Sequence, residues 1–381
     1  MYEEIISYIR EIYKKPEGII PLHTPVFSGN EKKYLLDCIE STFVSSIGEY
    51  VTKFEQKIAD YTGSTYAVAT VNGTAALHTA LVVAGVDSHH EVITQAVSFV
   101  ATANAISYCG AEPVFLDSDQ DTLGLSPQAL QDFLAGNTDQ RDDGCTYNSA
   151  SGKKITACIP MHVFGHPVKI DQIRSLCDHY NIILIEDAAE SLGSLYKGQH
   201  TGTFGRLGIL SFNGNKIITT GGGGVLLTDN KDFAQLAKHL TTTAKIDHPW
   251  EYAHDHVGYN YRMPNINAAL GYAQLEHMEK ILQCKRELAE NYRIFFKGIG
   301  IYFISEPEEC KSNYWLNAIA LESSVERNDF LRFSNDNGVL ARPIWKLLPD
   351  LPMYANSPRD ELTNARWLQD RIVNIPSSAI L

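Results

Sequence analysis

Lys216 stands between a predicted strand, residues 207–212, and four consecutive glycines at 221–224. Glycine allows close backbone approach and positive φ angles, so this segment can form a tight wall around a small ligand. An amine here can attack a carbonyl carbon if burial or a neighbouring cation lowers its pKa. The alternative is a solvated lysine beside a loose turn, and spacing alone leaves both open.

Two further segments carry groups that suit a phosphorylated ring. Asp187 follows an apolar strand at 182–186, and ligands of open α/β sheets bind beyond the carboxyl ends of the strands. Gly73 and Thr74 follow another strand and open a helix, where backbone N–H groups and a hydroxyl favour a phosphate. A helix N-cap for Asp187 and an ordinary helix start at Gly73 are the structural alternatives.

Together these features fit one cofactor, pyridoxal 5'-phosphate. Its phosphate needs the donors of Gly73, Thr74 and Ala75. Its ring nitrogen needs a carboxylate, Asp187, and its aldehyde needs an amine, Lys216, about 29 residues further along. The chain has no Walker pattern, and no GxGxxG follows the first strand. The sequence therefore indicates neither an NTPase nor a nicotinamide enzyme.

Five ordered motifs resemble the DegT-type nucleotide-sugar aminotransferases, from about residue 21 to the C-terminus. They are GTAAL at 73–77, SFVATAN at 98–104, DAA at 187–189, SFNGNK at 211–216 with its glycine-rich turn, and GYNYRM at 258–263. The resemblance implies an α/β protein, a pyridoxal-phosphate-dependent transferase of fold type I. In that fold a large domain with a mainly parallel mixed sheet precedes a smaller C-terminal α+β domain.

The resemblance also implies a role for each matching residue. Lys216 is the catalytic residue, which holds the cofactor as a Schiff base and then moves a proton to and from the substrate carbon. Asp187 pairs with the ring nitrogen and Phe99 stacks on the ring. In a homodimer with a shared active site, Asn260 or Arg262 reaches the phosphate of the neighbouring subunit. The implied cofactor contacts are Gly73, Thr74, Ala75, Phe99, Asp187, Glu190, Ser211, Asn213, Asn260 and Arg262.

Glu190 departs from the family pattern, since many relatives carry Gln or His beside the hydroxyl of the cofactor. A carboxylate there repels a phenolate unless one of the two holds a proton. We therefore expect a raised pKa for Glu190. The alternative is a side chain that faces solvent or a backbone donor.

The ends of the chain resemble the aminotransferases of the legionaminic acid and bacillosamine routes, which build surface glycans. The matching segments are 20–23, 29–34, 41–46, 342–345 and 374–378. This branch implies amino transfer from L-glutamate to the C4 ketone of a UDP-linked 4-keto-6-deoxy-N-acetylhexosamine. Its candidate substrate contacts are Ser45, His162, Trp315 and Arg342.

Other functions stay open. Another keto sugar nucleotide is the first alternative, either a GDP-linked sugar of the perosamine type or a dTDP-linked sugar with a C3 or C4 ketone. A pyridoxal-dependent dehydratase or epimerase is disfavoured by Lys216, which related dehydratases lack. A non-enzymatic regulator of this fold usually carries an added DNA-binding module, and here the N-terminal extension is short and acidic.

Alternating strands and helices must position these residues, which favours a mostly parallel sheet. Strands are predicted at 66–71, 91–95, 112–116, 155–161, 182–186, 207–212 and 224–228; helices at 3–14, 31–41, 50–61, 74–84, 99–109, 127–134 and 170–180. We expect a surface loop at 137–153 and one long helix from 265 to about 299. The predicted division is 1–264 for the N-terminal segment and large cofactor-binding domain, and 265–381 for the linking helix and smaller domain.

Composition excludes several classes of protein. The 381 residues include 32 Lys and Arg against 45 Asp and Glu, a net charge of −13. Without a basic patch this argues against nucleic acid as a partner. There is no apolar run of about 18 residues and no apolar signal core, so we expect a cytoplasmic protein that is not bound to a membrane. Seven cysteines form no CxxC pair, and no metal site is expected.

Overall fold

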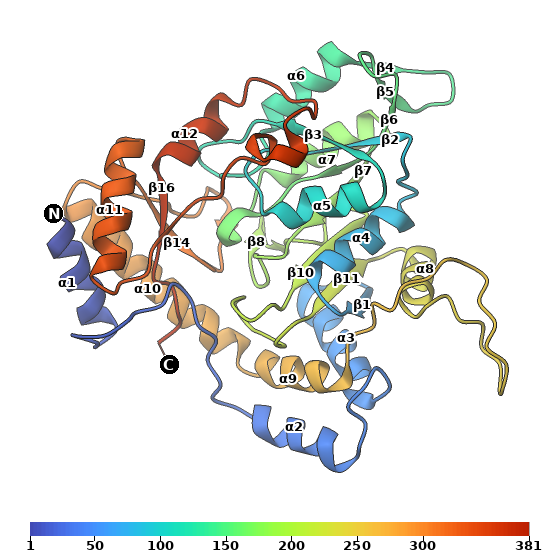
Figure 1. Ribbon diagram of the computed structural model, residues 1–381, viewed down its shortest axis with the longest axis horizontal. Coiled ribbons are helices and arrows are strands. Elements are labelled where there is room, and N and C mark those ends of the chain that lie inside the picture. The colour runs from blue at the N-terminus through green and yellow to red at the C-terminus, as the bar shows by residue number, and fades with distance from the viewer. Residues whose placement is uncertain (381) are drawn as a thin grey trace.

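The computed structural model describes residues 1–380, and a mixed sheet lies at its centre (Figure 1). The main path of this sheet has the order β1-β11-β10-β7-β6-β2-β3. β11 is antiparallel to both neighbours, and the other four pairs are parallel. The strands are β1 (Tyr66–Thr70), β2 (His90–Gln95), β3 (Glu112–Leu116), β6 (Lys154–Ile159), β7 (Ile183–Asp187), β10 (Leu207–Ser211) and β11 (Gly224–Thr228). The predicted α/β fold with a mainly parallel sheet is confirmed.

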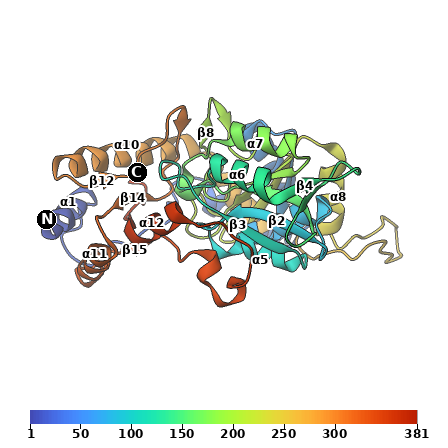
Figure 2. The same ribbon diagram turned by 90° about the horizontal axis from the view of Figure 1, so that it is seen from above.

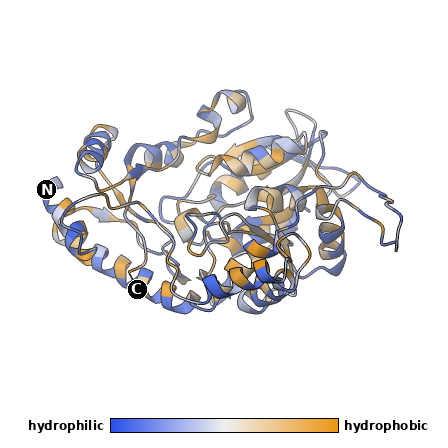
Figure 3. Ribbon diagram, turned by 60° about the horizontal axis from the view of Figure 1, so that its bottom comes forward, coloured by the Kyte–Doolittle hydropathy of each residue, from blue (hydrophilic) through white to orange (hydrophobic). Residues whose placement is uncertain are grey.

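Helices cover both faces of this sheet, which explains why nearly all residues of its strands β2, β6 and β7 are buried. Val92 and Ile93 are neighbours in β2 but belong to two different cores, because successive strand residues point to opposite faces. One face packs against α4 (Gly73–Val83), α5 (Val100–Tyr108) and α8 (Lys231–Thr241). The other packs against α3 (Glu49–Thr62), α6 (Pro127–Asn137), α7 (Ile170–His179) and α9 (Asn265–Leu275). Figure 3 shows the apolar residues gathered between these layers.

A short hairpin occupies part of the segment that we predicted to be a loop. β4 (Thr138–Gln140) pairs antiparallel with β5 (Thr146–Asn148), and β5 joins the main sheet beside β6. Gly144 in the connection has a φ of +75°, a conformation that favours glycine. Strands of three residues are too short to show an alternating pattern, so the sequence alone indicated only turns.

The prediction of one long helix over residues 265–299 is wrong, because two helices occupy this segment. α9 ends at Leu275 and α10 spans Met278–Gly298, because His277 between them leaves the helical region with φ −111° and ψ 7°. Glu276 at this break accepts hydrogen bonds from Asn30 and Tyr34, residues at the start of α2 (Glu31–Glu40). The break therefore presents Glu276 to the start of α2, which packs against α9.

A second sheet of four antiparallel strands follows α10, in the order β12-β14-β16-β15. Its strands are β12 (Tyr302–Phe303), β14 (Asn317–Ala320), β15 (Arg342–Pro343) and β16 (Ile372–Ile375), and its helices are α11 (Ser324–Asp336) and α12 (Thr363–Arg371). A third, small sheet pairs β13 (Cys310–Lys311) with β8 (Leu195–Tyr196), and β8 with β9 (Gln199–His200). It ties the C-terminal part of the chain to the large sheet.

The N-terminal helix α1 (Tyr2–Ile12) lies with the C-terminal elements, beside α10 and α11 (Figure 2). Ile5 and Ile9 are fully buried in one core with Phe296 and Phe330. The predicted division groups the N-terminal segment with the large domain in 1–264, whereas these contacts place α1 with the smaller sheet. The division of the chain at residue 265 stays a prediction.

The segment after α8, residues 242–258, projects from the body of the molecule (Figures 1 and 2). It carries three strongly exposed apolar side chains, Trp250, Tyr252 and Val257. Among the helices of residues 1–380, none combines the length and apolar character needed to span a bilayer.

Gly224 allows the close approach of β11 to the start of α4. A Cβ at this position would lie 2.4 Å from the carbonyl oxygen of Asn72 and 2.6 Å from the nitrogen of Gly73. We predict that Gly224→Ala lowers the free energy of unfolding in urea by about 1–3 kcal/mol, since the backbone must shift. Gly136→Ala in α6 is the matched control. Its Cβ meets nothing within 4 Å, so it should raise stability by up to ~1 kcal/mol; equal effects of the two changes would contradict this explanation.

Candidate active site

A cavity of about 350 Å³ lies where β7 and β10 end and α4 begins. It brings together most of the residues predicted from the sequence, although they come from segments far apart in the chain. Those that line it are Gly73, Thr74, Phe99, Asp187, Glu190, Ser211, Asn213, Lys216 and Trp315. The sequence prediction of one shared site for these residues therefore agrees with the geometry.

Lys216 and Glu190 face each other in this cavity. The Nζ atom of Lys216 is 3.2 Å from Oε1 of Glu190 and 4.1 Å from the centre of the Trp315 ring. An ammonium group over an indole face is attracted by the ring quadrupole. The amine is thus held between a carboxylate and an aromatic face, not in bulk solvent.

The carboxyl of Glu190 is buried. Its second oxygen accepts a hydrogen bond of 2.9 Å from the Phe164 N–H, and Asn313 donates to its backbone carbonyl. Burial raises the pKa of Glu190 to about 7, although Lys216 and the Phe164 N–H oppose that rise. The Glu190 side chain therefore has the raised pKa that we expected, and it also bonds a backbone donor, which was one of the two alternatives. The other alternative, a side chain that faces solvent, is excluded by its burial.

Asp187 ends β7 with its carboxylate at the cavity. One oxygen accepts a hydrogen bond of 2.7 Å from the Thr102 hydroxyl, and the other accepts from the Ala189 N–H at 3.2 Å. Burial raises the pKa of Asp187. A buried carboxylate that is oriented by a neighbouring hydroxyl suits the protonated nitrogen of a ring. Sequence reasoning missed Thr102, although it lies within the SFVATAN motif.

The start of α4 forms the proposed phosphate cradle with Ser211. A Cβ on Gly73 would lie 2.9 Å from the Ser211 Cβ, so only glycine lets the helix N-terminus come this close to the strand end. The hydroxyls of Thr74 and Ser211 and the N–H groups of Gly73 and Thr74 form a donor set that suits a phosphate dianion. Ala75 differs from expectation, because it does not line the cavity and its N–H donates to the Asn72 side chain at 2.8 Å.

Aromatic side chains form another wall of the cavity. Phe99 is half exposed, and its ring centroid lies 6.4 Å from that of Trp345. Trp345, which belongs to the motif at 342–345, also contacts Phe164 and lines the cavity. Arg342 of the same motif lies outside this cavity, where it donates to Asn335.

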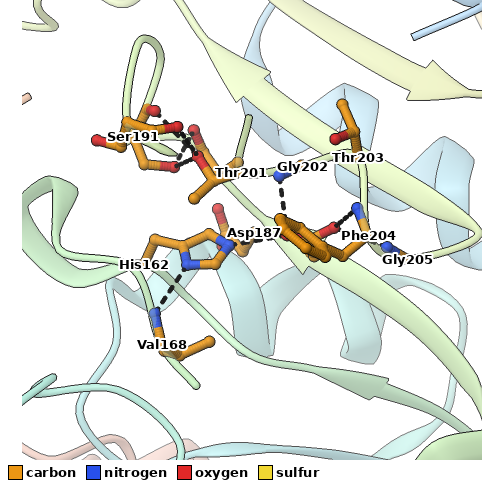
Figure 4. A network of polar contacts seen from close by, with 12 residues as sticks. His162, Val168, Asp187, Ser191, Thr201, Gly202, Thr203, Phe204 and Gly205 are labelled. Atoms are coloured by element: carbon orange, nitrogen blue, oxygen red, sulfur yellow. Dashed lines mark hydrogen bonds and ion pairs between the residues drawn. The ribbon is translucent and has the colours of Figure 1, made fainter. Parts of the chain in front are cut away.

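His162 takes a structural place and not the expected substrate contact (Figure 4). It is fully buried. Its Nδ1 accepts from the Val168 N–H at 3.2 Å, and its Nε2 lies 3.0 Å from the carboxylate of Glu186. Glu186 also accepts the N–H groups of Gly202, Phe204 and Gly205. Since both ring nitrogens are already bonded, His162 stabilises the strand that carries Asp187.

Three other predicted residues lie outside the cavity within this chain. Ser45 is exposed, and its carbonyl accepts from the Asn265 N–H. Asn260 is exposed. Arg262 lines a separate cavity of about 140 Å³ with Lys238, and its buried Nε has no hydrogen-bond partner in residues 1–380. The roles of Asn260 and Arg262 toward a second subunit stay predictions.

Three potential metal ligands come together at the base of the projecting segment, a grouping that their sequence spacing did not suggest. His239 Nε2 and His256 Nδ1 lie 2.6 and 3.0 Å from the same oxygen of Asp255. These two histidines lower the pKa of Asp255 to about 2. Distances this short between ligand atoms are those of a hydrogen-bonded His–Asp–His triad.

The buried carboxyl of Glu190 makes stability depend on pH. Its pKa rises from 4.5 to about 7 on folding, so between these values the folded chain binds more protons than the unfolded chain. Stability therefore falls as pH rises through this window. Relative to Glu190→Gln, cofactor-free wild-type protein should lose about 3 kcal/mol of unfolding free energy from pH 4.5 to pH 7.5. Urea unfolding at several pH values measures this difference, and a constant difference would contradict the prediction.

Comparisons with known proteins agree with this site. Residues 26–381 match the DegT/DnrJ/EryC1/StrS aminotransferase family. A GDP-perosamine synthase of Escherichia coli O157:H7 is 36% identical over 358 residues, which cover 94% of this chain and 93% of that protein. The putative pyridoxal phosphate-dependent aminotransferase EpsN of Bacillus subtilis is 38% identical over 336 residues, 88% of this chain and 84% of EpsN.

Solved structures show the same fold. The aminotransferase TlmJ from Streptoalloteichus hindustanus has a TM-score of 0.86 at 25% identity, with 94% of both chains covered. Together, the family match, the curated relatives and the cavity around Lys216 show that this chain is a pyridoxal-phosphate-dependent enzyme that belongs to the DegT/DnrJ/EryC1/StrS aminotransferase family.

Proposed function

We propose that this enzyme transfers an amino group to the ketone of a GDP-linked keto sugar, with Lys216 as its catalytic residue. The observation that carries the catalytic assignment is the contact of Lys216 with Glu190 in the cavity that also holds Asp187. The GDP-linked acceptor is supported by relatives named GDP-perosamine synthases, including one from Vibrio cholerae that is 35% identical over 364 residues.

The residues present fit the cofactor. Thr74 and Ser211 would hold its phosphate, Asp187 its ring nitrogen and Phe99 one face of its ring. When bound, pyridoxal phosphate supplies an electron sink for the carbon that gains or loses a proton. These contacts would orient the ring, and the amine of Lys216 would act from its place beside Glu190.

Lys216 and Glu190 form the proton-handling pair of this proposal. At 3.2 Å they can exchange a proton directly. Because burial brings the pKa of Glu190 to about 7, its carboxyl can accept or donate a proton near neutral pH. Apolar neighbours such as Leu77, Met161 and Ile209 line the same cavity and limit the access of water to the exchanged proton.

The amino donor and the assembly are part of the same proposal. We expect L-glutamate as donor and a homodimer with a shared active site. The exposed Trp250, Tyr252 and Val257 on the projecting segment support the dimer, because large exposed apolar side chains mark interaction surfaces. Asn260, which follows this segment, and Arg262 would then serve the cofactor of the second subunit.

A UDP-linked 4-keto-6-deoxy-N-acetylhexosamine is the second candidate acceptor. It is favoured by the motif at 342–345, because Trp345 of that motif lines the cavity. The amine product would then enter nonulosonic acid or bacillosamine-type glycan synthesis. Relatives named as aminotransferases disfavour the dehydratase and the regulator.

Acceptor choice can be tested directly. Purified enzyme with pyridoxal phosphate and L-glutamate is given a GDP-linked 4-keto-6-deoxyhexose or the UDP-linked 4-keto-6-deoxy-N-acetylhexosamine. We expect kcat/KM for the GDP-linked sugar to be at least roughly tenfold higher, a difference of about 1.4 kcal/mol in transition-state binding. Mass spectrometry of the aminated sugar and an assay of 2-oxoglutarate give the rates. Faster turnover of the UDP-linked sugar would select the second candidate, and no turnover of either would reject both.

The role of Lys216 has its own test. Lys216→Ala should lose the visible absorbance of covalently held cofactor, and its rate of 2-oxoglutarate formation should fall by ~10³-fold or more, as expected when a nucleophile is removed. Lys231→Ala, an exposed lysine at the start of α8, is the matched control and should keep both properties. Unchanged absorbance in the Lys216 variant would show that another amine holds the cofactor.

A further inference from the structure

A fully buried lysine lies behind the active site, outside the residues assigned above. Lys285 of α10 has no exposed side-chain surface. It forms no ion pair with a carboxylate in residues 1–380; its Nζ instead donates to the carbonyls of Trp315 at 3.1 Å and Ser377 at 2.5 Å. Lysine is almost never fully buried without an acidic partner, so this arrangement calls for an explanation.

The carbonyl that Lys285 holds belongs to the residue whose ring lies over Lys216. The Trp315 indole Nε1 donates to the carbonyl of Asn215 at 2.7 Å, and Asn215 is the residue before Lys216. The same ring lies 4.1 Å from the Lys216 Nζ. Trp315 is therefore fixed at three points: its carbonyl by Lys285, its N–H by the Asn313 side chain at 2.8 Å, and its indole nitrogen by Asn215.

The surroundings of Lys285 disfavour a charged amine. Burial lowers the pKa of Lys285 to about 7. Burial also lowers the pKa of nearby His23, and the charge of Lys285 lowers it further. In either protonation state the Lys285 amine has enough N–H groups for both carbonyls, and its two hydrogen bonds are directed at Trp315 and Ser377.

We propose that Lys285 is a positioning residue for the aminotransferase reaction: it holds the backbone of Trp315 so that the indole confines the amine of Lys216 beside Glu190. This inference rests on the catalytic role proposed for Lys216. Loss of the Lys285 hydrogen bonds would leave all cavity side chains present but would remove one of the three hydrogen bonds that fix Trp315, so that its ring can shift relative to Lys216. Misplacement of a reacting group by about 1 Å can cost 10²-fold in rate.

The competing explanation is that Lys285 only anchors the C-terminal segment of the chain, through Ser377. The structure provides a matched control for it. Tyr292, also buried on α10, donates from its hydroxyl to the carbonyl of Pro376 at 3.0 Å. Tyr292→Phe therefore weakens the same C-terminal anchor and leaves the hydrogen bond to Trp315 intact.

The experiment compares four variants of the holoenzyme. They are Lys285→Met, Tyr292→Phe, Trp315→Phe and the double variant that combines Lys285→Met with Trp315→Phe. Lys285→Met should lower kcat by roughly 10–100-fold, with KM for the amino donor within about threefold. Tyr292→Phe should keep kcat within about twofold. Because Lys285 acts through Trp315, the double variant should lose little more than Trp315→Phe alone. Additive losses, or an equal loss in Tyr292→Phe, would overturn the proposal.

A second readout needs no turnover. The near-ultraviolet circular dichroism of the Trp315 indole is obtained as the difference between each cofactor-free protein and its Trp315→Phe counterpart. It should weaken in Lys285→Met and persist in Tyr292→Phe; an unchanged signal in Lys285→Met would reject the proposal. If Lys285→Met does not fold, Lys285→Arg is measured, and its bulkier donor should change the Trp315 signal in the same direction. Failure of the Lys216 assignment is seen separately, as visible cofactor absorbance retained in Lys216→Ala.

Discussion

The active site depends on the parallel pairing of β7 with β10. In their register Ile209 lies opposite Asp187, so both strands end at the same edge of the sheet. Parallel strands present their carboxyl ends together, and this is where ligands of open α/β sheets bind. Asp187 at one strand end and the Ser211–Lys216 segment after the other are neighbours for this reason. Gly224 on β11 then lets the start of α4 close the third side.

This arrangement gathers two acids and one base in a poorly solvated space. Burial raises the pKa of both Asp187 and Glu190, and the opposing contacts differ. Thr102 and the Ala189 N–H bond the carboxylate of Asp187, whereas Lys216 and the Phe164 N–H meet that of Glu190. One acid is thereby suited to hold a cationic ring nitrogen, and the other to exchange protons near neutral pH.

The remaining walls come from the C-terminal part of the chain. Trp315 and Trp345 reach the cavity from segments that flank the smaller sheet, and α10 carries the lysine that holds Trp315. The core beneath this sheet includes Ile5 and Ile9 of α1. The first helix therefore stabilises the C-terminal part of the molecule, which supplies Trp315 and Trp345 to the site.

The sequence by itself determined the strands of the large sheet, most of the helices that cover it, and most residues of the cavity. Strand and helix alternation follows from local apolar periodicity, and Lys216, Asp187 and Thr74 stand in turns whose chemistry is local. The tertiary structure alone decided which groups meet. Thr102 bonds Asp187, His162 is enclosed by Glu186 and Val168, the N–H of Ala75 is taken by Asn72, and His277 interrupts a helix that looked continuous. Periodicity reports which face of an element is buried, whereas the partner of each buried polar atom depends on contacts between residues distant in sequence.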